Sequence, residues 1–223
     1  MKDVRVLLKQ VPLFEDFDEQ ELASVAPLFA ERQYRKGTIL FFDGDPGHDM
    51  FIIKKGLVKI YKLAEDKEIT LALLREGGFF GEMSLFQPGD TRSATAETIE
   101  PTTVYTLSRA SFQQFLEGSP KLCLKLLMVT AQRLRKANEQ IQDLTFLDVR
   151  SRIVKVIRRL ADDYGKPIPG GILVDVRLTH QQIANLAGTV RESVTKVLQE
   201  LQETGIIDVD QKRITVHDKA RLA

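Results

Sequence analysis

The stretch that most constrains this chain of 223 residues is the segment 119–147, SPKLCLKLLMVTAQRLRKANEQIQDLTFL, which predicts one long helix. Ser119 is a good helix N-cap, Pro120 suits the first helical position, and no glycine or further proline follows before Gly165. At 1.5 Å per residue the helix would be about 40 Å long, which exceeds an ordinary helix of a small domain. A helix of this length near the middle of the chain favours two domains, one on each side of it.

The apolar residues of this helix form two stripes. One stripe has the alternating three- and four-residue spacing of a two-stranded coiled coil, and such a seam requires a partner helix. The other stripe lies off the seam and is suited to packing against the preceding part of the chain. We therefore expect one face to dimerise and another to anchor a domain; the alternative is a solitary amphipathic core helix. The seam is Leu127, Thr130, Leu134, Ala137, Ile141 and Leu144, and the anchoring stripe is Leu122, Leu126 and Val129.

Charge and cysteine content exclude several classes of protein. The formal net charge is +1, with 19 Lys and Arg against 21 Asp and Glu in residues 1–147, and 13 against 10 in residues 148–223. The balance argues against non-specific polyelectrolyte binding, and the later basic excess leaves room for a nucleic-acid contact. Cys123 is the one cysteine, which excludes an intrachain disulfide and a cysteine-based metal cluster. No apolar run has the length of a membrane span and no signal-peptide core is present, so we expect a soluble, cytoplasmic protein without a membrane partner.

The residues before the long helix predict a β-rich domain. Asp18 and Glu21 form a predicted capping pair for a helix over residues 19–29. Between residues 33 and 108, β-branched and aromatic runs alternate with turn sequences about every ten residues, which indicates an antiparallel sandwich or barrel. A second helix is predicted after this region and ends at Gly118. The predicted strands are TILFF, MFIIK, LVKIYKL, ITLALL, SATAET and TTVYTL, and the packing residues of the second helix are Phe112, Phe115 and Leu116.

The residues after the long helix predict a winged helix-turn-helix. Asp148 can cap a first helix, and the loop KPIPGG then leads into a strand, ILVDV. Two further helices follow, joined by a tight turn at Gly188. Each is predicted to begin with a capping box, Thr179 with Gln182 and then Thr189 with Glu192. The segment IIDVD-QK-RITV predicts the two-stranded wing, and the packing residues of the first helix are Ile153, Val154, Ile157 and Leu160.

The segment 79–96, FFGEMSLFQPGDTRSATA, is the first candidate site. Gly81 permits close backbone approach, and the short helical turn that it opens presents N–H groups suited to an anion. Arg92 and Ser93 enter the following strand with a guanidinium and a hydroxyl, both suited to a phosphate. Glu82 is suited instead to a sugar hydroxyl, so the combination favours a sugar phosphate. The alternative is a surface turn with an ion pair between arginine and glutamate.

The segment TVRESVTK is the second candidate site. A recognition helix inserts its N-terminal residues into the major groove, where arginine binds guanine and glutamate accepts from cytosine. Arg191, Glu192 and Lys196 share the face opposite the apolar residues of this helix, so we expect them to be exposed toward DNA. For Glu192 the alternative is a purely capping role. The apolar residues are Val194, Val197 and Leu198.

These segments resemble the cyclic AMP receptor protein and fumarate-nitrate regulator (Crp/Fnr) family, in its cyclic AMP receptor branch. FGEMSLF, the Pro-Gly loop and RSATA are similar to the phosphate-binding cassette of that family, and TFLDVRSRI to its hinge. The likeness covers nearly the entire chain in the same order. It implies an α+β fold: a cyclic-nucleotide-binding, jelly-roll-like β-roll over residues 1–118, a dimerisation helix over 119–147 and a winged helix-turn-helix DNA-binding domain over 148–223.

The resemblance also implies a ligand site. Two positions on the dimer helix would face the purine, and here Ala137 and Asn138 replace the familiar Thr-Ser pair. Ala137 cannot hydrogen-bond a base, whereas the Asn138 amide offers a donor and an acceptor. Arg133, one turn earlier, could pair with Glu82 once ligand is present. The implied ligand-binding residues are Gly81, Glu82, Met83, Ser84, Arg92, Ser93, Arg133, Ala137 and Asn138.

A DNA site follows from the same resemblance. In the family the recognition helix reads a TGTGA-like half-site, and Lys196 stands where arginine is more usual, so one base would be read less strictly. Four further positions match phosphate contacts, which set the register without reading sequence; for His180 the alternative is an ordinary exposed residue at a helix start. The implied DNA-binding residues are Thr179, His180, Gln181, Arg191, Glu192, Ser193 and Lys196.

We therefore expect a homodimeric, ligand-gated transcription regulator that binds a palindromic operator in double-stranded DNA and contacts RNA polymerase. Cyclic AMP is the expected allosteric effector, and no permanent cofactor, metal ligand or catalytic residue is predicted; His48 and His217 are isolated. Ligand would change the packing of the dimer helices near Ala137 and Asn138, and the hinge at residues 146–148 would reorient the DNA domains. The alternatives are another cyclic nucleotide, a dinucleotide, another small molecule or no ligand; a module that regulates through protein contact; and an enzyme acting on cyclic nucleotides.

Overall fold

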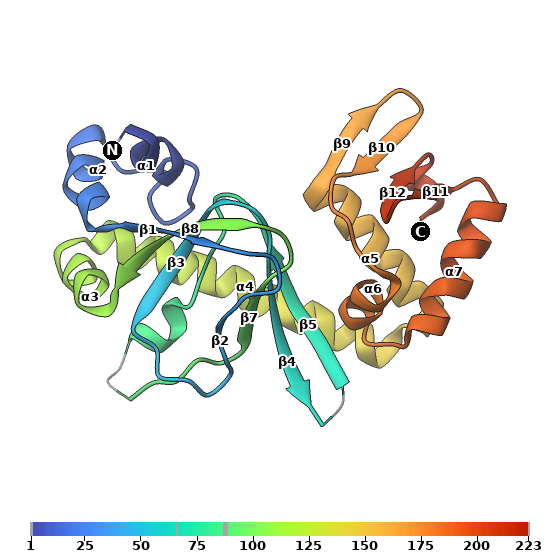
Figure 1. Ribbon diagram of the computed structural model, residues 1–223, viewed down its shortest axis with the longest axis horizontal. Helices are drawn as coiled ribbons and strands as arrows, with labels where there is room; N and C mark the ends of the chain where they lie inside the picture. The colour runs from blue at the N-terminus through green and yellow to red at the C-terminus, as the bar shows by residue number, and fades with distance from the viewer. Residues whose placement is uncertain (1, 66, 87–88, 223) are drawn as a thin grey trace. The chain divides into compact units, whose positions relative to one another are not determined.

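The computed structural model describes residues 2–65, 67–86 and 89–222. The chain divides into two compact units, residues 1–135 and residues 136–223, with the boundary inside the long helix. Figure 1 follows the order of the helices and strands along the chain. In the described part of the chain, no helix is long and apolar enough to cross a membrane. The division into domains at residues 118 and 147 stays a prediction.

Two four-stranded antiparallel sheets form the centre of the first unit, in the orders β1-β8-β3-β6 and β2-β7-β4-β5. Of the two predicted arrangements, a sandwich or a barrel, the chain forms the sandwich, and Phe51 and Phe80 stack in its core with ring centroids 5.0 Å apart. Two strands were not predicted, because β1 has no apolar alternation and β6 contains only two residues. The strands are β1 (Ala30–Tyr34), β2 (Ile39–Phe41), β3 (Asp49–Lys55), β4 (Val58–Ala64), β5 (Lys67–Leu74), β6 (Phe79–Phe80), β7 (Thr95–Thr98) and β8 (Thr102–Ser108).

Helices gather at one end of these sheets, where their apolar side chains form the larger core of the unit (Figure 1). The capping box of Asp18 with Glu21 is confirmed, but the helix that it opens ends at Val25 rather than at residue 29. Pro27 explains the early end, because proline cannot donate to an α-helical bond, and the chain continues as a 3₁₀ turn. The helices are α1 (Lys2–Leu8), which was not predicted, α2 (Glu19–Val25), η1 (Ala26–Leu28) and α3 (Arg109–Gly118).

The predicted long helix is confirmed as one continuous element, α4 (Pro120–Phe146), and the Ser119 hydroxyl caps it by accepting from the Leu122 N–H at 3.2 Å. Its anchoring stripe packs into the core of the first unit, together with Phe112, Phe115 and Leu116 of α3. The seam residues instead face outward. Leu127, Leu134 and Ile141 are 65, 62 and 61% exposed. The two stripes thus have the different surroundings that their spacing predicted.

The second unit combines helices with the sheet β11-β12-β10-β9. Asp148 caps α5 as predicted, accepting from the Ser151 N–H at 2.7 Å. Strand β9 was expected to be a loop; it is an edge strand, where Pro167 needs no ladder partner for its nitrogen. The elements are α5 (Val149–Tyr164), β9 (Gly165–Ile168), β10 (Gly171–Val174), α6 (His180–Ala187), α7 (Arg191–Glu203), β11 (Ile207–Asp210), β12 (Arg213–Val216) and η3 (Lys219–Arg221).

The second predicted capping box is wrong. Helix α7 begins after Val190, and no side chain of the described residues caps it. Gly188 ends α6 in the left-handed conformation, at φ 60°, and the Thr189 N–H then bonds back to the Ala184 carbonyl at 3.0 Å. Because Thr189 is held by the end of α6, α7 begins at Arg191 and Glu192 is left exposed rather than capping.

The anchoring stripe provides a test of how α4 is held. Leu122 has no exposed surface, so Leu122→Ala should lower the free energy of unfolding by about 2 to 5 kcal/mol through lost burial and a residual cavity. Leu124 is 59% exposed on the same helix, and Leu124→Ala should change it by less than about 0.5 kcal/mol. Urea unfolding followed by circular dichroism measures both variants. Equal effects would contradict the assignment of the buried face.

Candidate functional sites

The turn after β6 has a conformation that only glycine adopts without strain. Gly81 has φ 81°, and it leads into η2 (Glu82–Leu85), a 3₁₀ helix. A Cβ at this position would lie 2.7 Å from Nη1 of Arg92 and 3.2 Å from the carbonyl oxygen of Asp49. The close approach predicted at Gly81 is therefore observed, and what approaches it is the arginine of the same segment.

Arg92 is buried, with 5% of its surface exposed. Its Nη1 donates to the Gly81 carbonyl at 2.6 Å and to the Ser84 hydroxyl at 3.0 Å, and its Nη2 donates to the Asp49 carbonyl at 2.8 Å. The guanidinium also lies over the ring of Phe41, 4.2 Å from its centroid. Among the described atoms, the buried Nε has no hydrogen-bond partner. Burial lowers the pKa of Arg92, although nearby carboxylates oppose that shift.

The position of Arg92 in the chain differs from the prediction. It was expected to enter the following strand with Ser93, but β7 begins only at Thr95. The backbone of Arg92 instead pairs with the turn before β3: its N–H donates to the Asp45 carbonyl at 2.8 Å, and its carbonyl accepts from the Gly44 N–H at 2.9 Å. This turn therefore holds the arginine in place from the backbone side.

Glu82 pairs with α4. It is 4% exposed, and its Oε1 lies 2.5 Å from Nη1 of Arg133, whose Nη2 donates to the Phe79 carbonyl at 2.7 Å. Burial raises the pKa of the Glu82 carboxyl, and the charge of Arg133 opposes that rise. The pairing of Arg133 with Glu82 that the sequence suggested is therefore present. Oε2 of Glu82 is buried, and within the described residues it has no hydrogen-bond partner.

Five of the nine predicted ligand residues thus meet in one place, whereas four do not join them. The Ser93 hydroxyl is exposed and touches the sulfur of Met83 at 3.8 Å. Ala137 and Asn138 are exposed on α4 beyond the first unit. The four that meet through side chains are Glu82, Ser84, Arg92 and Arg133, and Gly81 contributes its backbone carbonyl.

Arg109 is a residue of this site that sequence reasoning missed. Its Nη2 donates to the carbonyls of Gly47 and Ser84, at 2.6 and 2.7 Å, so it ties η2 to the turn before β3. No sequence signal marks such a role, because both acceptors are backbone carbonyls and any residue could supply them. Within the described residues, no cluster of three side chains could hold a metal ion.

The second candidate site lies on α6 and α7. The capping box of Thr179 with Gln182 is confirmed, with Gln182 accepting from the Thr179 N–H at 2.8 Å. Nδ1 of His180 lies 2.8 Å from the Thr195 hydroxyl, which itself donates to the Arg191 carbonyl at 3.0 Å. Since the hydroxyl donates to that carbonyl, it is assigned as the acceptor from Nδ1–H of His180. A hydrogen bond joins Gln181 on α6 to Asn185 at 2.8 Å, so its amide is already partly engaged.

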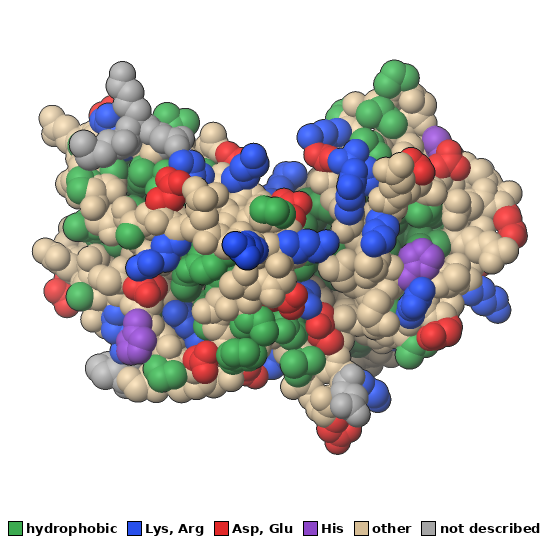
Figure 2. Space-filling model, in the orientation of Figure 1, with side chains coloured by type: hydrophobic (Ala, Val, Ile, Leu, Met, Phe, Trp, Pro, Cys, Tyr) green, Lys and Arg blue, Asp and Glu red, His purple; other side chains and the backbone are tan. Residues whose placement is uncertain are grey.

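The recognition helix presents its predicted faces. Arg191, Glu192 and Lys196 are exposed and Ser193 is half-buried, whereas the apolar residues opposite them are buried. Figure 2 shows basic and acidic side chains interspersed over the visible face, as the near-zero net charge leads one to expect.

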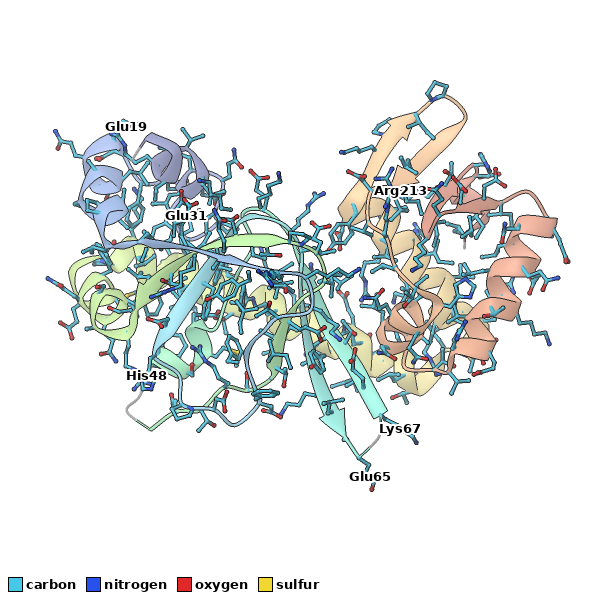
Figure 3. All side chains as sticks on the ribbon, viewed as in Figure 1. Glu19, Glu31, His48, Glu65, Lys67 and Arg213 are labelled. Atoms are coloured by element: carbon cyan, nitrogen blue, oxygen red, sulfur yellow. The ribbon has the colours of Figure 1, made fainter. Side chains whose placement is uncertain are left out.

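The wing next to these helices is fixed by charged contacts. Figure 3 labels Arg213 on β12, and a salt bridge of 3.5 Å joins it to Asp175, which Lys166 of β9 also approaches at 2.5 Å. His217 was expected to be isolated, but its two ring nitrogens lie 2.8 Å from the Gly170 carbonyl and from Asp208. Both acceptors raise the pKa of His217, the Gly170 carbonyl most.

Comparison with known proteins gives matches along both units. Residues 31–119 match the family model of the cyclic nucleotide-binding domain, and residues 151–223 that of the Crp-like helix-turn-helix domain. The chain is 32% identical over 218 residues to the "CRP-like cAMP-activated global transcriptional regulator" of Mycobacterium tuberculosis, covering 97% of both. It is 35% identical over 194 residues to the "Global nitrogen regulator" of Synechococcus elongatus, covering 86% of this chain and 87% of that one. A solved structure, the c-di-GMP-responsive global regulator CLP of Xanthomonas campestris, aligns with a TM-score of 0.75 at 28% identity, covering 86% of this chain and 95% of that one.

The crowding at Gly81 can be tested against a matched glycine. Gly44 has a similar φ of 88° but open space around it, so Gly44→Ala should cost only the backbone strain, about 1 to 2 kcal/mol. Gly81→Ala adds a collision with Arg92 and should cost at least about 1 kcal/mol more. Urea unfolding of both variants gives the comparison. A Gly81→Ala variant no less stable than Gly44→Ala would contradict the packing described for the turn.

Proposed function

The chain belongs to the Crp/Fnr family of transcription regulators, and on that premise we propose that it is a homodimeric regulator whose binding to a palindromic operator is controlled by cyclic AMP. The observation that carries the proposal is the pair of opposite buried charges around Gly81. Oε2 of Glu82 and Nε of Arg92 are both buried and, among the described residues, without a hydrogen-bond partner. Such groups are costly to bury unless a ligand completes their hydrogen bonds.

A sugar phosphate would complete these bonds. The phosphate would accept from the N–H groups at the start of η2 and from Nε of Arg92. A ribose hydroxyl would donate to Oε2 of Glu82. The base would then reach Ala137 and Asn138, where only the asparagine can hydrogen-bond. Neither permanent cofactor nor metal has a role in this proposal.

Cyclic AMP is our first choice of ligand because the Mycobacterium tuberculosis relative is named as cAMP-activated and matches the chain along 97% of its length. The second candidate is a cyclic dinucleotide, since the Xanthomonas campestris structure is described as c-di-GMP-responsive. Ala137 favours keeping this alternative, because it removes one base contact that a mononucleotide site would use. A regulator active without ligand is the remaining alternative. The relative from Synechococcus elongatus is named a global nitrogen regulator, so the names of the relatives do not all refer to cyclic AMP.

We attribute dimerisation to the exposed seam of α4. Leucine and isoleucine at 61 to 65% exposure on one stripe of a 27-residue helix are the knobs that a partner helix would cover. Helix-turn-helix dimers place their recognition helices about 34 Å apart, one turn of the duplex, so each α7 would read one half-site of a palindrome. The regulator would act in the cytoplasm, where the operator and RNA polymerase are found.

Reading of the operator would fall to α7. Arg191 would bind a guanine, Glu192 would accept from a cytosine, and Lys196 would contact a base with a single donor rather than a fork. Four residues would contact phosphates: Thr179, His180, Gln181 and Ser193. The chain has no catalytic role in this scheme.

The ligand gate is tested with Arg92→Leu, and Arg32→Leu, exposed on β1, is the matched control. Loss of charge-assisted bonds to the phosphate should weaken cyclic AMP binding by about 10- to 100-fold in calorimetric titration. The variant should also lose the nucleotide response of operator binding. The control should bind like the unaltered chain. Cyclic GMP and c-di-GMP belong in the same panel. An unchanged nucleotide response in Arg92→Leu would contradict the proposed role of Arg92. If c-di-GMP binds more tightly than cyclic AMP, c-di-GMP becomes the proposed effector.

The reading role of α7 is tested with Arg191→Ala and Glu192→Ala, on an operator selected from random duplexes. Each should lower operator affinity by about 1 to 3 kcal/mol and relax the preference at one base position. Gln202→Ala, exposed at the far end of α7, should leave affinity unchanged. If the unaltered chain binds all duplexes alike, the module that regulates through protein contact becomes the better interpretation.

A further inference from the structure

One arginine joins the ends of two helices in the second unit. Nη1 of Arg152, on α5, donates to the Leu147 carbonyl just after α4, at 3.2 Å. Its Nε and Nη2 donate to the carbonyls of Ala187 and Gly188 at the end of α6, at 3.0 and 3.3 Å. These are carbonyls that a helix C-terminus leaves without an internal partner, and they carry the negative end of the helix dipole. A planar guanidinium spreads its five donors over three nitrogens and can reach both ends at once, whereas an ammonium has three donors on a single nitrogen.

A second contact joins the same two segments. A Cβ at Gly188 would lie 2.7 Å from Cδ2 of Leu144, so the last turn of α4 packs directly against the turn between α6 and α7. Leu144 is also a residue of the predicted dimer seam and is 43% exposed. The side chain that a partner helix would cover is therefore the one that touches the helix-turn-helix turn.

Charges tie the last turn of α4 to α5 as well. Oδ1 of Asp143 lies 2.5 Å from Nζ of Lys155, and its other oxygen lies 3.6 Å from Arg159. The Leu147 N–H bonds to the Asp143 carbonyl at 3.1 Å. The residues expected to act as a hinge, 146–148, are thus bordered on both sides by bonded residues, and residue 148 itself caps α5.

We propose that Arg152 is a positioning residue for the recognition helix: with Leu144 and Asp143 it makes the end of the α4 seam and the turn before α7 one rigid element. The inference rests on the proposed function. A rotation of the seam would then be passed to α7 without a flexible joint at residues 146–148.

The experiment measures operator affinity with and without cyclic AMP, and the ratio of the two affinities is the coupling. Arg152→Gln should lower this ratio by about fivefold or more while calorimetric affinity for cyclic AMP stays within about twofold. Arg152→Lys keeps the charge but loses the forked donors, so its ratio should lie between those of the unaltered chain and Arg152→Gln. Arg150→Gln is the matched control: Arg150 pairs with Glu200 at the surface, both side chains being about half exposed, and this variant should leave the ratio unchanged.

Hydrogen exchange supplies a readout that does not need a ligand response. Arg152→Gln should speed amide exchange at residues 144–148 and 186–190 together, and Leu144→Ala should do the same if the glutamine variant fails to fold. A merely structural role would weaken operator binding equally with and without nucleotide and leave the ratio intact, which would overturn the proposal. Unchanged exchange in a folded variant would also overturn it. If operator binding by the unaltered chain does not respond to nucleotide, the proposed function is wrong. The amide exchange rates then test by themselves whether Arg152 makes these segments one rigid element.

Discussion

The burial of one face of α4 is the constraint on which the rest of the structure depends. Leu122, Leu126 and Val129 join α4 to the core of the first unit, and burying three such side chains stabilises the contact by several kilocalories per mole, on the order of 1.5 to 3 each. Because the helix turns about 100° per residue, fixing this face also fixes where Arg133 and the seam point. The same helix therefore pairs with the buried Glu82 in one unit and carries the exposed seam toward its end.

Two buried opposite charges, Glu82 and Arg92, lie beside the turn at Gly81 in the first unit. Glu82 and Arg92 are each removed from water. Burial raises the pKa of the Glu82 carboxyl and lowers the pKa of the Arg92 guanidinium. Arg133 compensates the carboxylate, and backbone carbonyls compensate the guanidinium. Each group nevertheless keeps one polar atom without a partner among the described residues. In the proposed function, a ligand with both a phosphate and a hydroxyl would bond to these two atoms, and its binding energy would act on α4 through Arg133.

In the second unit, side chains again bond to backbone carbonyls at the ends of helices. Arg152 completes the ends of two helices, and Gly188 admits Leu144 because it has no Cβ. The second predicted capping box failed for a related reason: the Thr189 N–H is used by the end of α6, which moves the start of α7 to Arg191. The exposed face of α7 was nevertheless correctly predicted, since the periodicity of its apolar residues does not depend on the cap.

The sequence by itself determined the features that depend on residues close together in the chain. These are the caps at Asp18, Ser119, Asp148 and Thr179, the two stripes of α4, the antiparallel strands, and the glycine turn at Gly81. Each depends on hydrogen bonds or periodicities that span only a few positions. Tertiary structure alone decided the pairing of Glu82 with Arg133, 51 positions apart, the role of Arg109, and the contacts of Arg152 with the end of α6. The reason is physical: these bonds join distant segments, and most end on backbone carbonyls, which every residue type provides alike.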